Sequence, residues 1–313
     1  MKPRTLKSFL AAIALTVTTG PLVQAQEPVM QLPAPVESGY VATNGIEMFY
    51  ATYGKGDGDP VVLLHGGLGQ IEMLGPLLAA AAEGHRVIGF DLRGHGRTLP
   101  FDAPFRYETF ADDVAGALRT LGVSRADVIG YSLGGGTALR LAIQHPELVE
   151  RLVVVSAPFA FAGWHDYNQQ GMRSISSALL PQMEGTPMHD AYTAVAPDPA
   201  NFGVLLDRMG EWANFDYDWA TEVPSISAPT MLVFGDWDAV RTSHIARFFE
   251  LLGGGQQDAG WGAENMNANR LAIIPGETHY SIFASPKLGR IALAFVDGED
   301  GSATGAPVES PSR

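Results

Sequence analysis

The sequence predicts an α/β protein built on a mostly parallel, doubly wound sheet with an inserted helical lid. Short continuous runs of Val, Ile and Leu alternate with helical patterns along most of the chain, as expected of strands that helices cover on both faces. The alternation stops after Pro158 and resumes near residue 230, and the segment between is too apolar to be a linker. Glycine-rich turns follow several of the strands, which is where a parallel sheet carries its active site.

The elements of the expected sheet follow in order along the chain. Residues 46–53 alternate in polarity after the turn Asn44-Gly45, which indicates a hairpin strand. The other expected strands are 60–64, 87–90, 126–129, 151–155, 230–234 and 270–274, and the expected helices are 73–82, 107–121, 137–142, 242–252 and 286–295. The core then comprises residues 40–158 and 222–297, and the lid, 159–221, is inserted after the strand at 151–155.

Both ends of the chain differ from the core. Three basic residues precede the apolar run 9–15, and Val23-Gln24-Ala25 offers small residues for cleavage, which is typical of a secretory signal peptide over residues 1–25. The run has about half the length that a membrane-spanning helix needs. Residues 26–39 are Pro-rich and are expected to form an exposed leader, and 298–313 are expected to be a disordered tail. We therefore predict a periplasmic or secreted protein that is cut after Ala25.

Composition excludes several classes of partner and site. The chain has 313 residues, 46% hydrophobic and 17% charged, which is enough to bury a large core. Removal of the first 25 residues takes away three positive charges and no negative ones, which changes the formal net charge from -14 to -17. A surface of that sign repels phosphates and anionic lipids, so we expect no nucleic-acid partner and no stable membrane association. The sequence contains no cysteine, which excludes disulfides and thiolate sites.

The turn Gly130-Tyr131-Ser132-Leu133-Gly134 lies between an expected strand and an expected helix. Glycines on both sides let the backbone reverse sharply beneath the serine, which is the geometry of a nucleophile elbow. A serine hydroxyl needs a neutral imidazole to accept its proton, and the imidazole needs a carboxylate to orient it. Asp236 and Asp238 follow the strand at 230–234 and His279 follows the last strand, so the chain offers these groups in the order serine, aspartate, histidine.

Five motifs make the chain resemble the α/β-hydrolase family over essentially its whole mature length. They are His65-Gly66-Gly67, Asp91-Leu92-Arg93-Gly94-His95-Gly96-Arg97, Gly130-Tyr131-Ser132-Leu133-Gly134-Gly135, Gly235-Asp236-Trp237-Asp238 and Gly276-Glu277-Thr278-His279. The resemblance implies an α/β-hydrolase fold with Ser132 as nucleophile and His279 as general base. The family pattern selects Asp238 over Asp236 as the acid. It also implies an oxyanion hole made by the backbone N–H groups of Gly67 and Leu133, with Leu68 as an alternative to Gly67.

The inserted segment 159–221 is rich in Trp, Tyr and Met and poor in basic residues. We expect it to rest on the active-site mouth and to line an apolar pocket, with Leu68, Tyr131, Trp164 and Trp237 in contact with substrate. The histidines show no recognised metal-ligand spacing, and the glycines show no dinucleotide-binding pattern. We therefore expect neither a metal nor a cofactor.

These observations favour a carboxylesterase-like serine hydrolase that acts on neutral, apolar small esters through an acyl-enzyme on Ser132. Lactonase, carbon–carbon bond hydrolase and aminopeptidase activities remain open, since all of them use the same triad on this fold. A non-catalytic binding protein on the same scaffold is less favoured, because all three triad residues are present. The sequence leaves the physiological substrate and the oligomeric state open.

Overall fold

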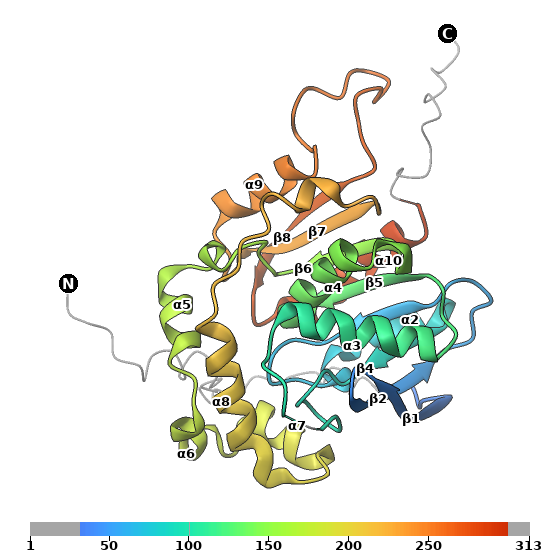
Figure 1. Cartoon of the computed structure of the whole chain (residues 1–313). Coiled ribbons are helices and arrows are strands. Elements are labelled where there is room, and N and C mark those ends of the chain that lie inside the picture. The colour runs from blue at the N-terminus through green and yellow to red at the C-terminus, as the bar shows by residue number, and fades with distance from the viewer. Residues whose placement is uncertain (1–31, 100, 300–313) are drawn as a thin grey trace, which may run out of the picture.

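A computed structural model describes residues 32–99 and 101–299 of the chain. Its centre is an eight-stranded sheet with the order β1-β2-β4-β3-β5-β6-β7-β8 (Figure 1). The strands are β1 (Glu37–Thr43), β2 (Ile46–Tyr53), β3 (Val61–Leu64), β4 (Val87–Phe90), β5 (Ala126–Tyr131), β6 (Val149–Val155), β7 (Thr230–Trp237) and β8 (Arg270–Thr278). The β1–β2 and β2–β4 pairs are antiparallel and all other pairs are parallel. The predicted mostly parallel α/β sheet is confirmed.

Helices cover both faces of the sheet. Val62 and Leu64 of β3 belong to one buried cluster, whereas Val61 and Leu63 belong to another on the opposite face. The first face is covered by α3 (Tyr107–Thr120), α4 (Leu133–Gln144) and α9 (Thr242–Leu251), and the second by α2 (Gly75–Gly84) and α10 (Pro286–Val296). Short 3-10 turns η1 (Ile71–Leu74), η2 (Pro146–Leu148) and η7 (Ile282–Ala284) connect core elements. Burial on two faces explains why the strands are continuous apolar runs.

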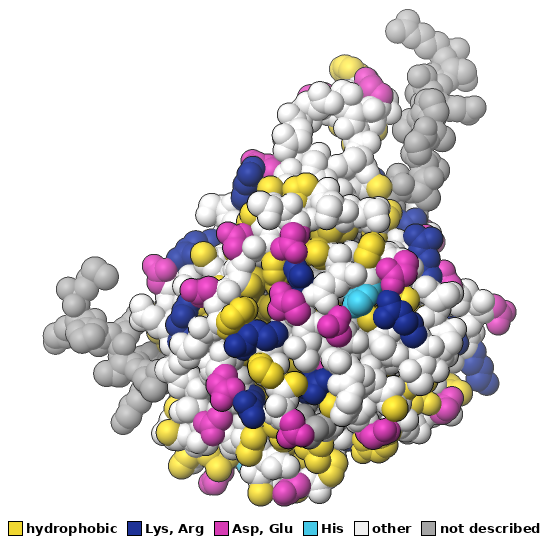
Figure 2. All heavy atoms as spheres, viewed as in Figure 1, with side chains coloured by type: hydrophobic (Ala, Val, Ile, Leu, Met, Phe, Trp, Pro, Cys, Tyr) yellow, Lys and Arg dark blue, Asp and Glu magenta, His cyan; other side chains and the backbone are white. Residues whose placement is uncertain are grey.

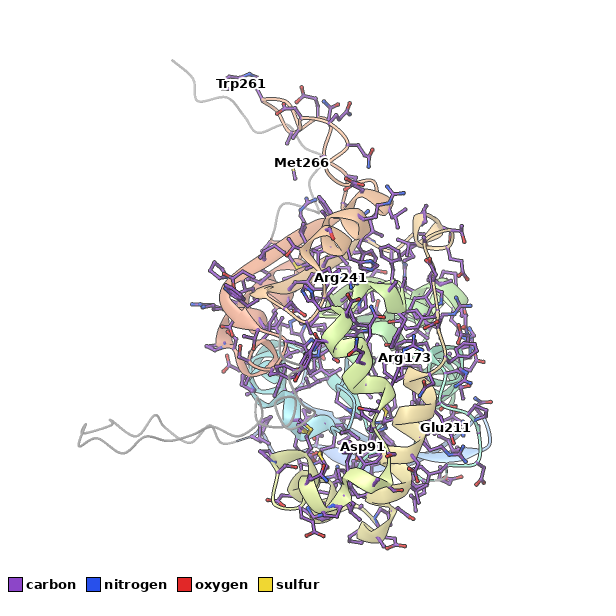
Figure 3. All side chains as sticks on the ribbon, turned by 90° about the vertical axis from the view of Figure 1, so that its left-hand side faces the viewer. Asp91, Arg173, Glu211, Arg241, Trp261 and Met266 are labelled. Atoms are coloured by element: carbon purple, nitrogen blue, oxygen red, sulfur yellow. The ribbon has the colours of Figure 1, made fainter. Side chains whose placement is uncertain are left out.

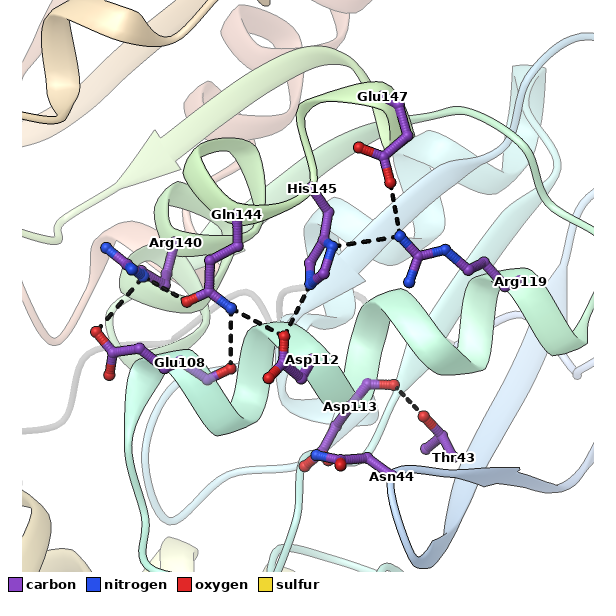
Figure 4. Close-up of polar contacts among 10 residues, drawn as sticks. All are labelled: Thr43, Asn44, Glu108, Asp112, Asp113, Arg119, Arg140, Gln144, His145 and Glu147. Carbon is purple, nitrogen blue, oxygen red and sulfur yellow. Dashed lines mark hydrogen bonds and ion pairs between the residues drawn. The ribbon is translucent and has the colours of Figure 1, made fainter.

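Polar contacts join α3 and α4 along their exposed edge (Figure 4). Gln144 donates a hydrogen bond to the Asp112 carboxylate at 2.9 Å, and the same carboxylate lies 2.8 Å from Nε2 of His145. The Thr43 hydroxyl donates to the backbone carbonyl of Asp113 at 2.7 Å, which ties the β1–β2 hairpin to α3. The contacts of Asp112 join α3 to the end of α4, and α4 begins directly after Ser132.

Residues 159–221 form a helical layer beside one end of the sheet (Figure 1). This lid contains η3 (Phe161–Gly163), α5 (Asp166–Arg173), η4 (Ser177–Leu179), α6 (Leu180–Met183), α7 (Pro187–Val195), η5 (Pro199–Asn201) and α8 (Phe202–Ala213), and η6 (Val223–Ser225) follows it. α8 is the centre of the layer, because it contacts α5, α6 and α7 and buries Leu205, Leu206, Met209 and Trp212. Figures 1 and 3 show α5 and α8 side by side.

The two ends of the lid leave the core next to each other. The N–H of Phe161 donates to the carbonyl of Tyr217 at 2.9 Å, and the N–H of Trp219 donates to the carbonyl of Phe159 at 3.0 Å. We call these two paired segments, 159–161 and 217–219, the neck. The neck brings the start and the end of the insertion to one place on the core.

The structure corrects the predicted start of the core. β1 begins at Glu37, and Gly39 pairs with Tyr50 of β2, so residues 37–39 belong to the sheet and not to the leader 26–39. The start of this strand was not predicted, because the segment before it is Pro-rich and because β1 forms through pairing with β2 rather than through a pattern of its own. Residues 32–36 are irregular and mostly exposed. The predicted signal peptide, 1–25, and leader residues 26–31 lie outside the described residues.

Three further boundaries also differ from the prediction. β7 continues to Trp237 and β8 to Thr278, because a register shift after Gly235 lets Trp237 pair with Thr278. At the other end, the N–H groups of Gly298 and Glu299 bond back to α10 at 3.1 and 2.9 Å, so the first two residues of the predicted tail 298–313 close that helix. Residues 300–313 lie outside the described residues.

Acidic and basic side chains are interspersed over the face shown in Figure 2. Across residues 32–99 and 101–299, no helix combines the length and the apolar character needed to cross a membrane.

Candidate active site

Ser132 occupies a strained turn between β5 and α4. Its backbone has φ 54° and ψ −114°, a conformation that side chains rarely adopt. A Cβ on Gly130 would lie 2.1 Å from the carbonyl oxygen of Gly134, and a Cβ on Gly134 would lie 2.2 Å from that of Leu64. Only glycine fits these two positions, so the sequence pattern around the serine is a direct consequence of the turn.

The ends of three strands bring a serine, a histidine and an aspartate into contact. Ser132 follows the last residue of β5, Asp238 the last residue of β7, and His279 the last residue of β8. The Ser132 hydroxyl lies 3.1 Å from Nε2 of His279, and Nδ1 of His279 lies 3.3 Å from Oδ1 of Asp238. The imidazole therefore bridges a hydroxyl and a carboxylate, the arrangement that nucleophilic serine chemistry requires.

Asp238 is held as a buried carboxylate. It accepts hydrogen bonds from the Ser156 hydroxyl at 2.5 Å and from the N–H groups of Gly235 and Val240, each at 3.2 Å. Burial by itself raises the pKa of Asp238. The hydrogen bonds and the charge of the facing His279 lower the pKa by more than burial raises it, so it lies below its usual value. The carboxyl group is thus ionised at neutral pH and available to the imidazole.

Asp236 has a different position. It is exposed, and its carboxylate accepts a hydrogen bond from the N–H of Gly276 at 2.8 Å. It ties β7 to β8 at the sheet edge, whereas Asp238 is the aspartate in contact with His279. The choice between the two aspartates that the family pattern favours agrees with these contacts.

Sequence reasoning missed Ser156. This fully buried residue directly follows β6, has a positive φ of 52°, and directs its hydroxyl at Asp238. No motif marks it. Its position was the available signal, since residues at the carboxyl ends of neighbouring parallel strands meet at one edge of the sheet.

The loop after β3 lies against the start of α4. An added Cβ on Gly67 would lie 3.8 Å from Cβ of Leu133, and the N–H of Leu133 is the first of α4 and has no intrahelical acceptor. His65 fixes this loop, since its Nδ1 lies 2.7 Å from the carbonyl of Gly66 and its Nε2 accepts from the N–H of Leu92 at 3.0 Å. Burial lowers the pKa of His65 to about 4, so the ring is neutral and structural.

Ser132 and His279 open into a cavity of about 160 Å³ beneath the lid. Gly67, Leu68, Leu133 and Trp164 line it, as predicted for the site. The apolar lining is completed by Met172, Ile175, Leu179, Met183, Met188, Leu206, Met209, Trp212 and Ala239. Asn168, Ser174 and Tyr280 add polar groups, and none of the described lining residues is Lys, Arg, Asp or Glu. The cavity is therefore suited to an uncharged, mainly apolar group.

Two predicted substrate contacts are corrected. Tyr131 lies on the same side of β5 as Ile129 and packs toward the α2 and α10 face, away from the cavity. Its hydroxyl donates to the backbone carbonyl of His279 at 2.6 Å, and burial raises its pKa well above the usual value, so the proton stays in place. Trp237 is 79% exposed at the end of β7 and does not line the cavity.

The lid entry is attached to the chain that follows Asp238. Trp164 forms an antiparallel bridge with Val240, and its ring lies edge-on to His279 with centroids 5.3 Å apart. The N–H of Arg241 donates to the carbonyl of Gly163 at 2.9 Å, and its guanidinium pairs with Asp166 at the start of α5 at 2.5 Å. The part of the cavity wall that carries Trp164 is therefore bonded directly to the loop that follows Asp238.

Among the described residues, no three or more His, Cys, Asp or Glu side chains gather closely enough to hold a metal ion. The contacts at the site are those of a serine, an imidazole and a carboxylate.

Comparison with known proteins supports the same fold. A family model described as alpha/beta hydrolase fold matches residues 59–202. A putative carbamate hydrolase of Pantoea ananatis is 35% identical over 210 residues, which cover 59% of this chain and 74% of that protein. An sn-1-specific diacylglycerol lipase of Danio rerio is 30% identical over 181 residues, which cover 56% of each chain. The chain thus spans about half the length of that lipase.

Other likenesses cover more of the chain at lower identity. A 2-hydroxy-6-oxo-6-(2'-aminophenyl)hexa-2,4-dienoic acid hydrolase of Metapseudomonas resinovorans is 26% identical over 294 residues, which cover 85% of this chain and 94% of that protein. The crystal structure of the enol-lactonase from Burkholderia xenovorans LB400 has a TM-score of 0.60 at 24% identity, over 83% of this chain and 100% of that one. At this identity the structural likeness shows the fold alone.

Proposed function

The chain belongs to the α/β-hydrolase family, and from this premise we propose that it is a serine hydrolase of carboxylic esters of neutral, apolar small substrates, with Ser132 as nucleophile. One observation carries the proposal. The contacts that run from Ser132 through His279 to Asp238 open into a cavity whose described lining carries no charged side chain.

The proposed reaction proceeds in two acyl transfers. His279 removes the proton of Ser132 as the serine oxygen attacks the ester carbonyl carbon, and Asp238 stabilises the imidazolium that forms. We assign the backbone N–H groups of Gly67 and Leu133 as the donors to the carbonyl oxygen as it becomes negative. His279 then gives its proton to the departing alcohol, which breaks the ester bond and leaves an acyl-serine. A water molecule, deprotonated by His279, then attacks the acyl carbon, the bond from that carbon to the serine oxygen breaks, and His279 returns the proton to Ser132 as the acid leaves.

The uncharged cavity supports neutral esters and lactones over substrates that carry a carboxylate or an ammonium group. A relative that carries a dienoic acid in its name acts on a carboxylate, and a carboxylate enclosed without a cation loses its hydration with no compensating partner. An aminopeptidase faces the same cost for the ammonium group of its substrate, because no carboxylate side chain lines the described cavity. Neutral esters and lactones avoid both costs, and the intact triad supports catalysis over simple binding.

A substrate panel tests the proposal. We expect p-nitrophenyl butyrate to be hydrolysed, the half-ester of succinate to be turned over at least tenfold less efficiently in kcat/KM, and amino-acid amides to be inert. A neutral lactone in the same panel is the rival substrate. Higher kcat/KM for the lactone, or for the charged half-ester, would contradict the proposal.

A phosphonate probe tests the nucleophile. We expect the wild-type protein to be labelled on Ser132 and Ser132→Ala to be unlabelled, folded and inactive, with ester turnover reduced by about 10⁴-fold or more because the triad acts as a unit. The melting temperature of Ser132→Ala checks that the fold is intact. Labelling of Ser132→Ala would show that another residue is the nucleophile.

We also propose that the chain is exported to the periplasm or medium. The basic, apolar and small-residue regions of residues 1–25 support this. Expression of the full chain in a Gram-negative host should yield a mature protein that begins at Gln26, as read by N-terminal sequencing. A cytoplasmic product that keeps Met1 would contradict the proposal. The expectations that the protein binds neither nucleic acid nor membranes stay predictions.

A further inference from the structure

Among the described residues, three polar side chains line the cavity in addition to Ser132, His279 and the tryptophans: Asn168, Ser174 and Tyr280. They differ in what their polar atoms contact. The hydroxyl of Ser174 donates to the carbonyl of Gly171 at 2.7 Å within the lid. The amide nitrogen of Asn168 donates to the hydroxyl of Tyr280 at 3.3 Å, so this pair joins α5 of the lid to the residue after His279. We call Asn168 and Tyr280 the rim pair.

The rim pair keeps hydrogen-bonding capacity beyond its mutual contact. Once the Tyr280 oxygen has accepted from Asn168, its own proton is still available to a further acceptor. The Asn168 amide likewise retains a second N–H and its carbonyl oxygen. Burial raises the pKa of Tyr280, so the phenol is protonated at neutral pH and can donate. Tyr280 is 44% exposed, which places the pair at the mouth of the cavity rather than in its apolar interior.

The chemistry of the proposed reaction decides which part of the substrate meets the rim pair. His279 must reach the oxygen of the departing alcohol to protonate it, so the alcohol lies beside the imidazole. The ring of Tyr280 is edge-on to that imidazole, with centroids 5.3 Å apart. The interior of the cavity, lined by Met188, Leu206, Met209 and Trp212, is left for the apolar acyl chain.

We propose that the rim pair is a subsite for the alcohol portion of the substrate, and that the enzyme prefers esters whose alcohol carries a second hydrogen-bonding group, such as a hydroxyl. This inference rests on the proposed esterase function and narrows its substrate class. The substrates it names join an apolar acyl group to a diol or polyol.

Two isosteric esters test the inference. Butyl butyrate and 3-hydroxypropyl butyrate release the same acid and differ in the alcohol by one methyl group replaced by a hydroxyl, so acid release at constant pH follows both. We expect wild-type kcat/KM to be about fivefold higher for the hydroxypropyl ester, the effect of one net hydrogen bond. Asn168→Leu and Tyr280→Phe preserve most of the side-chain volume and should each bring the ratio of the two esters to about one.

Ser174→Ala is the matched control. It removes a hydroxyl from the same cavity, but that hydroxyl already donates its single proton to the Gly171 carbonyl, so the substrate hydroxyl loses no donor and the ratio should stay near the wild-type value. Because each ratio is internal to one variant, a general loss of activity cancels. A wild-type ratio of one, or a ratio that survives in both rim variants, would overturn the subsite while the esterase function stands. Failure of the wild-type protein to hydrolyse either ester would overturn the esterase function and the subsite with it.

Discussion

The strand ends and the lid contribute to the same cavity with different degrees of constraint. Ser132, Asp238 and His279 each follow the last residue of a strand, and Asp238 receives hydrogen bonds from a side chain and two backbone N–H groups. In the lid, α5 buries Gly171 and α7 buries Tyr192, while most other residues of these helices are exposed or half-buried. The positions of Ser132, Asp238 and His279 are thus fixed by the sheet, whereas α5 and α7 of the lid bury few of their own residues.

The largest expected difference concerns the two aspartates of the strand ends. Asp238→Asn should lower kcat by roughly 10⁴-fold, because the amide cannot hold the imidazole in the tautomer that accepts the serine proton. Asp236→Asn should lower it less than threefold, since this exposed residue contacts Gly276 and not His279. Steady-state kinetics on one neutral ester compares them. Similar losses in both variants would show that the acid is misassigned.

The next effect is on stability and its pH dependence. Ser156→Ala keeps a Cβ at the positive-φ position but removes a hydrogen bond to a buried carboxylate, which should lower the free energy of unfolding by about 1.5 to 3 kcal/mol at pH 7. The pKa of Asp238 is depressed in the folded protein, so its stabilising effect is present above its unfolded pKa of about 3.9 and is lost as pH falls through the lower folded pKa.

Removal of the Ser156 hydroxyl raises that folded pKa toward the unfolded value. The unfolding free energy that Ser156→Ala loses relative to the wild type should therefore have its full value at pH 7 and pH 5. This difference should become smaller below about pH 4. Urea unfolding at these pH values measures it. An equal deficit at pH 7 and pH 3 would mean that the hydroxyl acts through packing and not through the charge of Asp238.

A smaller effect is expected at Tyr131. Tyr131→Phe keeps the ring between His279 and Phe283 but removes the hydrogen bond to the His279 carbonyl. The loss of one such bond, about 1 kcal/mol, should lower kcat roughly fivefold with little change in KM, because Tyr131 does not line the cavity. Initial rates measured over a range of substrate concentrations give kcat and KM separately. A rise in KM at constant kcat would indicate direct contact with substrate.

The smallest expected effects on kcat/KM come from the length of the acyl chain in the lid cavity. Each methylene added to the acyl chain should raise kcat/KM by at most about fourfold, the equivalent of about 0.8 kcal/mol, until the cavity is full. A cavity of about 160 Å³ is close to the ~150 Å³ that accommodates benzene in an engineered protein. Specificity should thus increase from acetate through butyrate to hexanoate and decrease at octanoate. A constant kcat/KM across the series would show that the acyl chain lies outside the lid cavity.

Much of the sheet and of the site could be predicted because local physics determines it. Strands buried on two faces are continuous apolar runs, and the turn at Ser132 tolerates only glycine at Gly130 and Gly134. Ser156 was not predicted, because its contact with Asp238 depends on the pairing of β6 with β7, and no local sequence pattern indicates that pairing. The placement of Tyr131 was wrong although its spacing from Ile129 indicates a shared side of β5.

The lid could be predicted as an apolar insertion but not in detail. Its helices are short, and α5, α6 and α7 are organised by contact with α8 rather than by strong patterns of their own. Trp237 illustrates the same limit at the sheet edge. Its exposure follows from the register shift that extends β7, and that shift depends on the partner strand.

The neck has a consequence for how the lid can change in evolution. Because segments 159–161 and 217–219 are bonded to each other, everything between them begins and ends at one point on the core. A different insertion, longer or shorter, is therefore compatible with the same sheet, provided that those two segments and the contacts of residues 163–166 with Val240 and Arg241 are kept. Exchange of the residues between these attachment points changes the wall of the cavity and leaves in place the strand ends that carry Ser132, Asp238 and His279.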